Sequence, residues 1–171
     1  MVFDVVASQR RRYLEVVLPA VERFKAEWPG LSLAVLATDG PTQGFGLPPA
    51  RWATITAVAT GLCRYRDDRS ELADASDDDL VAHWAAAVEP VRLTPRLDPY
   101  VGAVSGIGIA LFAYMRMRSG ADALKPDVRV RSHLARLGFP APANEAALLL
   151  VGEAAAEELL IPRLVLDQML W

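Results

Sequence analysis

The sequence predicts an all-α protein, organised as a helical bundle of two lobes. Hydrophobic residues make up 53% of the 171 residues, and runs of the β-branched and aromatic residues that favour strands are few. Apolar residues also recur at helical spacing in several long segments. A chain of this length fits one domain that is large enough to bury a core.

The first helical segment runs from Ser8 to Trp28, where the spacing of the apolar residues is that of one helix face. Pro19 lies inside this pattern, so either the helix kinks there or a new helix begins with Pro19 in its first turn. Leu33 to Ala37 is a short apolar run that periodicity cannot assign. The stretch from Gly40 to Pro49 is rich in glycine and proline and is predicted to be a loop.

A long buried helix is predicted from Pro49 to Tyr65, because its residues are apolar on almost every side. The run from Ser76 to Asp79 is typical of a helix start, since its carboxylates complement the helix dipole, and it leads into Leu80 to Val88. Adjacent aspartates also allow a metal-site interpretation, but side chains on one helical turn point in different directions. We therefore expect this cluster to begin a helix.

The stretch from Tyr100 to Phe139 follows a proline-interrupted linker, and the rest of the chain is arranged around it. It is predicted to form a short helix, a glycine turn at Gly106 to Gly108, a second apolar helix, a polar turn and a further helix. The two glycines allow a tight turn and expose N–H groups at a helix N-terminus, where a phosphate can bind. An ordinary helix–helix turn is the alternative interpretation.

The last of these helices begins in the tripeptide Lys125-Pro126-Asp127. Pro126 disfavours a helical conformation at Lys125, and Asp127 is then placed as the N-cap of the helix from Val128 to Leu137. A plain helix cap is the simplest role for this aspartate.

Two more helices are predicted near the C-terminus. Asn144 is the expected N-cap of Glu145 to Leu160, and a short helix covers Leu164 to Trp171. We expect the chain to form one lobe from residues 1–50 plus 140–171 and a second lobe from 51–139, which contains the two hairpin helices at 100–118.

The central stretch resembles the helix-hairpin-helix (HhH-GPD) DNA glycosylases of the endonuclease III and alkyladenine glycosylase type. The resemblance is carried by Ser105-Gly106-Ile107-Gly108 and Lys125-Pro126-Asp127-Val128-Arg129-Val130, followed by Leu134 and Leu137-Gly138. It implies an enzyme of DNA base-excision repair. In such an enzyme the hairpin residues Gly106, Ile107 and Gly108 bind the DNA backbone, and Asp127 is the catalytic carboxylate.

The resemblance also implies a binding face for double-stranded DNA. Lys125 and Arg129 flank Asp127 and suit contacts to phosphates. An extruded base needs a pocket, and the gap that it leaves in the duplex needs a side chain to fill it. The candidates for the pocket or the gap-filling residue are Trp52, Arg64, Tyr65, Trp84 and Tyr100.

Three departures from the family pattern qualify these expectations. Ala110 stands where the strand-cutting members hold a lysine nucleophile, so no Schiff base can form there. The resemblance therefore implies a monofunctional glycosylase that removes an alkylated base, because a cationic leaving base needs less activation. Ser105 and Leu111-Phe112 also differ from the usual residues. The alternative is a catalytically inactive helix-hairpin-helix module that binds nucleic acid or protein.

The composition limits cofactors. One cysteine, Cys63, and two histidines do not supply the ligands of a cysteine-bound zinc or iron–sulfur centre. We therefore expect no cofactor and no metal site, although the resemblance allows a monovalent ion at the hairpin.

The charge and hydropathy of the chain limit its partners. The net charge of −3 opposes nonspecific binding to DNA, but basic residues outnumber acidic ones between Arg116 and Arg136, which leaves a local basic face. The uncharged run from Pro99 to Met115 is too short to span a membrane, and no secretory signal is visible. We expect a cytoplasmic monomer without a membrane partner, associated with the nucleoid when it is bound to DNA.

Overall fold

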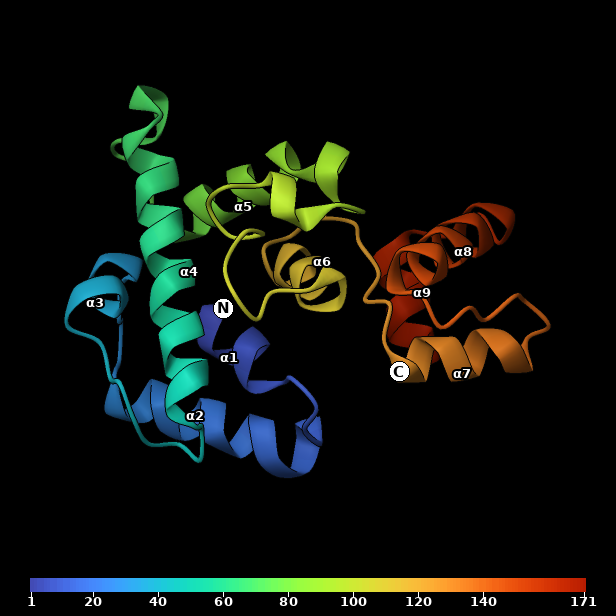
Figure 1. The fold of residues 1–171 in the computed structure, drawn as a ribbon, viewed down its shortest axis with the longest axis horizontal. Coiled ribbons are helices and arrows are strands. Elements are labelled where there is room, and N and C mark those ends of the chain that lie inside the picture. Colours follow the sequence, from blue (N-terminus) through green and yellow to red (C-terminus); the bar gives the residue numbers. More distant parts are fainter.

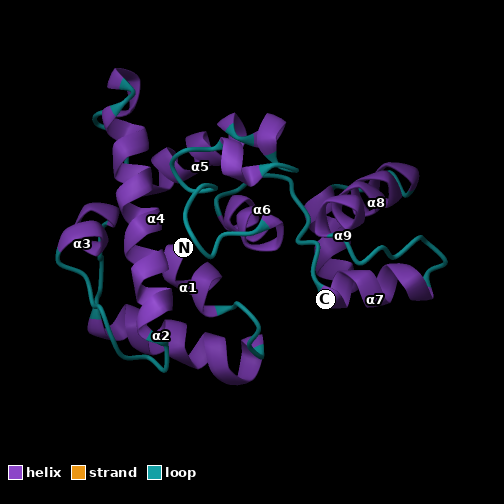
Figure 2. Cartoon of the chain, in the orientation of Figure 1, coloured by secondary structure: helices purple, strands orange, loops and turns teal.

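The computed structural model describes all 171 residues, and it is built from helices and loops without a strand (Figure 2). The predicted all-α class is confirmed. No helix combines the length and the apolar character that crossing a membrane requires. The nine α-helices are α1 (Val2–Ala7), α2 (Leu18–Glu27), α3 (Leu33–Thr38), α4 (Pro49–Asp67), α5 (Asp77–Ala87), α6 (Ile109–Arg118), α7 (Val128–Arg136), α8 (Glu145–Glu158) and α9 (Arg163–Leu170).

The N-terminal region resolves the alternatives that periodicity leaves open. α2 has Pro19 in its first turn, where a backbone N–H would have no partner within the helix, so proline costs no hydrogen bond there. A single π-helical turn at Tyr13–Val17 precedes α2. The unassigned run at Leu33 is helical, and Ser32 caps α3 by accepting a hydrogen bond from the N–H of Val35 at 3.2 Å. The predicted loop between α3 and α4 is confirmed.

The long helix predicted from Pro49 is formed as α4, and α1, α3 and α5 pack against it (Figure 1). It is not buried on every side, because seven of its 19 residues are buried and Ala53, Ala57 and Thr60 are exposed. Gly61, in its middle, faces the carbonyl of Tyr100 so closely that a Cβ atom would lie 1.8 Å from the oxygen. Only glycine permits this approach of two backbones. The chain that leads into α6 is thereby held directly against α4.

The expected first helix of the hairpin is not formed, and residues 100–107 consist of turns. These turns are held by tertiary contacts: a Cβ atom on Gly102 would lie 1.9 Å from the carbonyl oxygen of Pro95, and the buried carboxylate of Asp98 accepts a hydrogen bond from the indole of Trp84. The motif predicted at 100–118 is therefore a set of turns followed by one helix, α6.

The buried apolar residues form two clusters, and they divide the chain differently from the predicted lobes. The larger cluster joins 28 residues between Val2 and Met115, whereas the smaller joins nine residues between Leu124 and Leu170. The C-terminal helices α8 and α9 pack on α7, and α1 and α2 pack beside α4, so the two ends of the chain do not share a core (Figure 1). Periodicity shows which helix face is apolar, but not which helix covers it.

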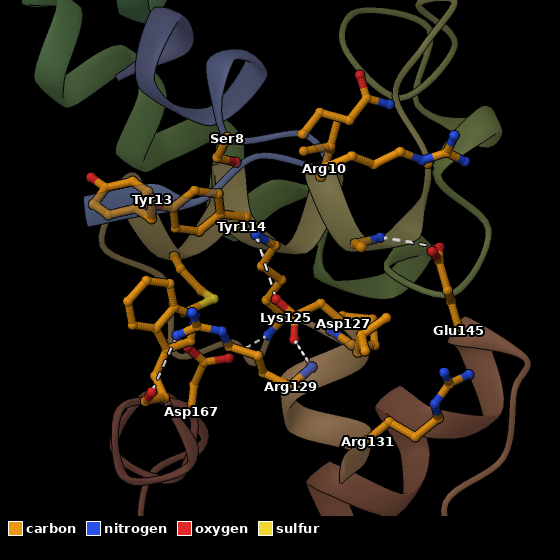
Figure 3. Close-up of a pocket in the computed structure, with 18 of the residues that line it drawn as sticks. Ser8, Arg10, Tyr13, Tyr114, Lys125, Asp127, Arg129, Arg131, Glu145 and Asp167 are labelled. Carbon is orange, nitrogen blue, oxygen red and sulfur yellow. Dashed lines mark hydrogen bonds and ion pairs between the residues drawn. The ribbon is translucent and has the colours of Figure 1, made fainter. Parts of the chain in front are cut away.

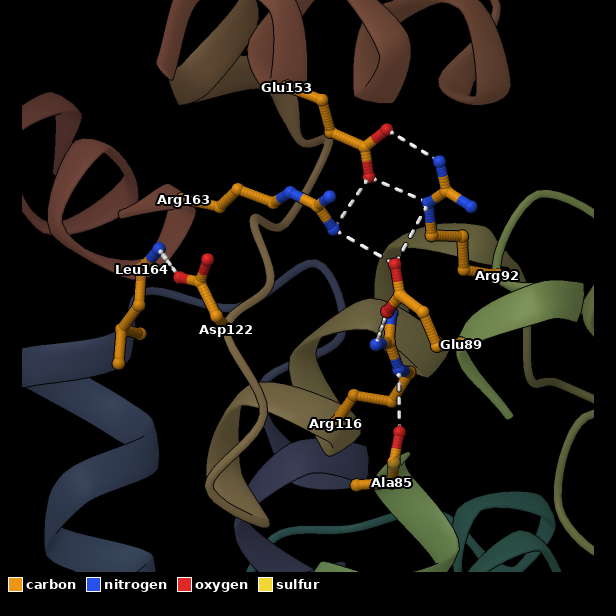
Figure 4. Close-up of polar contacts among 8 residues, drawn as sticks. All are labelled: Ala85, Glu89, Arg92, Arg116, Asp122, Glu153, Arg163 and Leu164. Atoms are coloured by element: carbon orange, nitrogen blue, oxygen red, sulfur yellow. Dashed lines mark hydrogen bonds and ion pairs between the residues drawn. The ribbon is translucent and has the colours of Figure 1, made fainter. Parts of the chain in front are cut away.

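A cluster of ion pairs joins the two parts of the molecule (Figure 4). Glu89, after α5, contacts Arg116 of α6 and lies 3.0 Å from Arg163 of α9, while Arg92 binds Glu153 of α8 at 2.7 Å. Burial acts to raise the pKa of Glu89, but Arg163 and Arg116 outweigh it and lower the pKa below its usual value. Arg116 and Glu153 are buried, so these charges depend on one another for compensation.

Candidate functional site

A cavity of about 1120 Å³ lies where the two parts of the molecule meet. Its walls come from the segment before the π-helical turn, the glycine turn and α6, the start of α7, and parts of α8 and α9 (Figure 3). Pockets for small ligands usually measure roughly 300 to 1,000 Å³. The volume is therefore sufficient for a group the size of a nucleotide.

Asp127 lies on the wall of this cavity and caps α7, as the sequence predicts. Its Oδ1 accepts hydrogen bonds from the N–H groups of Arg129 at 2.9 Å and Val130 at 3.1 Å. Its Oδ2 lies 3.7 Å from Nζ of Lys125 (Figure 3). The side chain keeps 24% of its surface exposed. One oxygen therefore fixes the carboxylate to the helix, and the other is left for a cation or a ligand.

The glycine turn lines the same cavity through Gly106 and Gly108, while the side chain of Ile107 is buried in the larger core. Gly106 has φ +92°, a conformation that L side chains rarely adopt, so glycine is required there. Gly108 is extended and does not need to be glycine for its conformation. Ala110 also lines the cavity.

A carboxylate of the chain itself occupies the N-terminus of α6. Oε2 of Glu145 accepts a hydrogen bond from the N–H of Ala110 at 3.4 Å, and a Cβ atom on Gly108 would lie 3.8 Å from the same oxygen (Figure 3). Helix N-termini attract anions. The position expected for a DNA phosphate thus already holds an internal negative charge, which a phosphate would have to displace.

The cavity is positively charged although the whole chain is acidic. Seven cationic side chains and three carboxylates line it. The cations are Arg10, Arg11, Arg12, Arg118, Lys125, Arg129 and Arg131, and the carboxylates are Asp127, Glu145 and Asp167. Such a wall concentrates anionic ligands locally. The basic face expected from the central stretch is extended by an arginine run from the N-terminal segment.

Lys125 and Arg129 are oriented by aromatic rings. Nζ of Lys125 lies 4.5 Å from the ring centroid of Tyr114, and the guanidinium of Arg129 lies 4.4 Å from that of Trp171. Cations over aromatic faces are held by the ring quadrupole while their N–H groups can still bind an anion. Tyr13 completes this group, because its ring lies nearly perpendicular to that of Trp171, with 5.7 Å between the ring centroids.

The five residues proposed from the sequence as base pocket or gap filler do not line this cavity. Trp52, Tyr65 and Trp84 are buried in the larger core. Arg64 donates a hydrogen bond to the carbonyl of Pro99, and Tyr100 donates one to Asp68, both away from Asp127. The aromatic residues of the cavity are Tyr13, Tyr114 and Trp171, and no sequence signal distinguished them from residues that pack a core.

Asp167 is a second carboxyl group in the cavity that sequence reasoning missed. It projects from α9, is 5% exposed, and its Oδ1 accepts a hydrogen bond from the N–H of Lys125 at 2.8 Å (Figure 3). Burial, assisted by the charge of Asp127, raises the pKa of Asp167 to about 6. The only signal in the sequence was a carboxylate between the apolar positions Leu166 and Leu170 of a short amphipathic helix.

No group of three His, Cys, Asp or Glu side chains converges in a way that could hold a metal ion. Comparison of the chain with protein-family models, with curated proteins and with solved structures gave no match.

Proposed function

We propose that the protein is a monofunctional DNA glycosylase, which hydrolyses the N-glycosidic bond of a damaged base. The observation that carries the proposal is that Asp127 is braced by the first turn of α7 and lines the same cavity as the Gly106–Gly108 turn. The resemblance of the central stretch to helix-hairpin-helix glycosylases assigns roles to these same residues.

The chemistry suits a fixed carboxylate. When the bond between the sugar and the base breaks, positive charge develops on the sugar ring. The ionised carboxylate of Asp127 would stabilise that charge and orient the attacking water. Because two backbone N–H groups already hold its Oδ1, little reorganisation is needed at the moment of reaction.

The surroundings of Asp127 suit an extruded nucleotide. Lys125 and Arg129 can bind phosphates on either side of it, and Tyr13 and Trp171 offer ring surfaces for a base. Ala110 lies in the cavity where a lysine would allow strand cleavage, so the proposed activity ends at the abasic site. A site in which Asp127 is the only catalytic group suits an alkylated, cationic base, because such a base leaves as a neutral molecule.

One observation favours the alternative of a catalytically inactive binding module. Glu145 occupies the anion position at α6, which weakens the proposed anchoring of a phosphate at the glycine turn. In that case the positive cavity would bind nucleic acid or an acidic protein segment without chemistry.

The decisive experiment is an assay for abasic sites on duplexes that contain alkylated purines, uracil or oxidised guanine. Asp127→Asn keeps the helix cap, because asparagine caps about as well as aspartate, but removes the charge. We expect wild type to release at least one base and Asp127→Asn to lose activity by about 100-fold or more.

A matched control is Ser76→Ala, which removes the cap of α5 far from the cavity. It should lower stability by about 1 kcal/mol and leave the rate of base release unchanged. Equal rates for wild type and Asp127→Asn, or no release from any duplex, would leave the binding module as the surviving function.

A further inference from the structure

Two of the three carboxyl groups in the cavity, Asp127 and Asp167, have contrasting surroundings. Asp127 is partly exposed, accepts hydrogen bonds from two backbone N–H groups and faces the ammonium group of Lys125. Asp167 is 5% exposed and is bonded to one N–H group only. Pairs of titratable groups whose environments separate their pKa values divide acid and base roles between them.

The free oxygen of Asp167 is available to a ligand. Oδ1 is taken by the N–H of Lys125, whereas Oδ2 accepts no hydrogen bond from the protein. Oδ2 is not fully enclosed by the protein, so a ligand in the cavity can reach it. Because the residue lines the cavity and this oxygen has no partner within the chain, Oδ2 can exchange a proton or a hydrogen bond with a ligand there.

The charged groups around Asp167 come from two sides. From the segment before α7, Asp127 raises its pKa and Lys125 lowers it. From α7, Arg129 lies over the ring of Trp171 and donates to the carbonyl of that residue. Across the cavity, burial raises the pKa values of Tyr13 and Tyr114, so both phenols stay protonated.

The remaining charges on α8 and α9 are engaged elsewhere. Glu145 bonds to the N–H of Ala110, Glu153 pairs with Arg92, and Arg163 pairs with Glu89 and Glu153. None of them contributes to the pKa of Asp167. The pKa of Asp167 is therefore raised by its burial and by the charge of Asp127, against the hydrogen bond and the charge of Lys125.

We propose that Asp167 is the proton donor to the leaving base, so that the site can release neutral bases as well as cationic alkylated ones. This inference rests on the proposed glycosylase function and names a substrate class for it. A neutral base leaves as an anion unless it is protonated, whereas an N-methylated purine with a positive ring leaves as a neutral molecule. A site with Asp127 as its only catalytic group would release only the cationic N-methylated purines.

The step balances as follows. The bond between the sugar carbon and the base nitrogen breaks, and its electron pair stays on the base. The proton on Oδ2 of Asp167 moves to the base. The oxygen of water bonds to the sugar carbon, and the proton that this water loses goes to Asp127. Solvent then returns a proton to Asp167 and accepts the one from Asp127, so both carboxyl groups regain their starting states.

The pH dependence of this step has a definite direction. With a pKa of about 6, Asp167 is mostly protonated below that pH and mostly ionised above it. The rate of neutral-base release should fall as the pH rises above about 6. Release of a cationic base should not show this fall.

The test compares wild type with Asp167→Asn on two sets of duplexes, one with an N-methylated purine and one with hypoxanthine or uracil. Asparagine keeps an oxygen for the N–H of Lys125 but has no carboxyl proton. We expect neutral-base release to fall by about 100-fold or more and cationic-base release to change by no more than about threefold. The alkaline fall in the neutral-base profile should disappear in the variant.

Two further variants separate chemistry from structure. Asp167→Glu retains a proton donor and should recover part of the neutral-base activity. Asp122→Asn changes an aspartate that accepts a hydrogen bond from the N–H of Leu164 but does not line the cavity, and it should retain both activities. Thermal melting of each variant shows whether it is folded.

The outcomes distinguish the two proposals. If wild type releases only cationic bases, or if Asp167→Asn affects both substrate sets equally or neither, the role of Asp167 is refuted while the glycosylase function stands. If wild type releases no base from any duplex, both are refuted.

Discussion

The two parts of the molecule differ in what holds them together and in what they contribute to the cavity. The larger core contains aromatic side chains such as Trp52, Trp84 and Phe112, and Phe3 stacks on Phe24 with 4.2 Å between ring centroids. The smaller core of α7, α8 and α9 consists of nine leucine, valine and alanine residues. The larger part thus buries far more apolar surface.

The smaller part, although it buries less apolar surface, supplies most of the groups proposed to react or bind in the cavity. Asp127 and Asp167, together with Lys125 and Arg129, belong to the smaller part, while the larger part contributes the glycine turn, Tyr13 and Tyr114. Regions with few buried contacts open more readily than the main core. The comparison indicates a rigid wall on one side of the cavity and a more easily displaced wall that carries the reacting groups on the other.

Shortening one leucine in each core is expected to give the largest effect, and it tests whether the two parts differ in stability. Leu62 and Leu134 are both fully buried, one in each core, and each change to alanine should cost about 2 to 5 kcal/mol. Hydrogen exchange should show Leu62→Ala lowering protection throughout the chain, and Leu134→Ala lowering it mainly in α7 to α9. Equal loss of protection everywhere would mean that the two cores unfold as one unit.

Charge reversal tests whether the smaller part supplies the binding face. Lys125→Glu combined with Arg129→Glu should weaken binding to duplex DNA by about 100-fold or more, because two phosphate contacts are replaced by repulsion. The matched control reverses Arg23 and Lys25, which are exposed on α2 of the larger part. Fluorescence anisotropy at constant salt measures both, and unchanged binding by the first pair would remove the proposed DNA face.

The stability of the smaller part should depend on Asp167 in a pH-dependent way. Its pKa is raised from 3.8 to about 6 in the folded protein, so the folded state binds more protons than the unfolded state between these values. Stability should therefore fall as the pH rises from about 4 to about 6, and Asp167→Asn should remove about 1 to 3 kcal/mol of this loss. Urea titrations at the two pH values measure it, and identical pH dependence in both proteins would contradict the assigned pKa.

The smallest expected effect concerns the contact between the two parts at α6. Glu145→Gln removes the negative charge beside the N–H of Ala110, and a carboxylate at a helix N-terminus is worth about 0.3 to 1 kcal/mol. Duplex affinity should rise by about two- to fivefold as the anion position becomes free. Unchanged or weaker binding would show that the glycine turn does not meet a phosphate.

Several features of the fold could be read from local sequence. Asp127 caps α7, Ser76 caps α5 and Asn144 caps α8, each through a bond to an N–H group two or three residues ahead. Pro19 begins a helix for an equally local reason. The predicted first hairpin helix is not formed, and the turns in its place are held by tertiary contacts such as that of Asp98 with Trp84, which no local pattern reveals.

The site was predictable only where its residues are neighbours in sequence. Lys125, Asp127 and Arg129 lie within five residues and share one wall of the cavity. Tyr13 and Trp171 reach the same cavity from opposite ends of the chain, and their spacing resembles that of ordinary core residues. The aromatic candidates chosen from the sequence do not line this cavity, because apolar side chains give no sign of which core or cavity they enter.

The sequence by itself determined the helical class, most helix boundaries and the capped position of Asp127, because these depend on residues within one turn of each other. The tertiary structure alone decided that α9 lies beside Lys125, across 42 positions of the chain, and so brought Asp167 to Asp127. That pairing arises from how apolar faces cover one another, and the same faces could have been covered in another order.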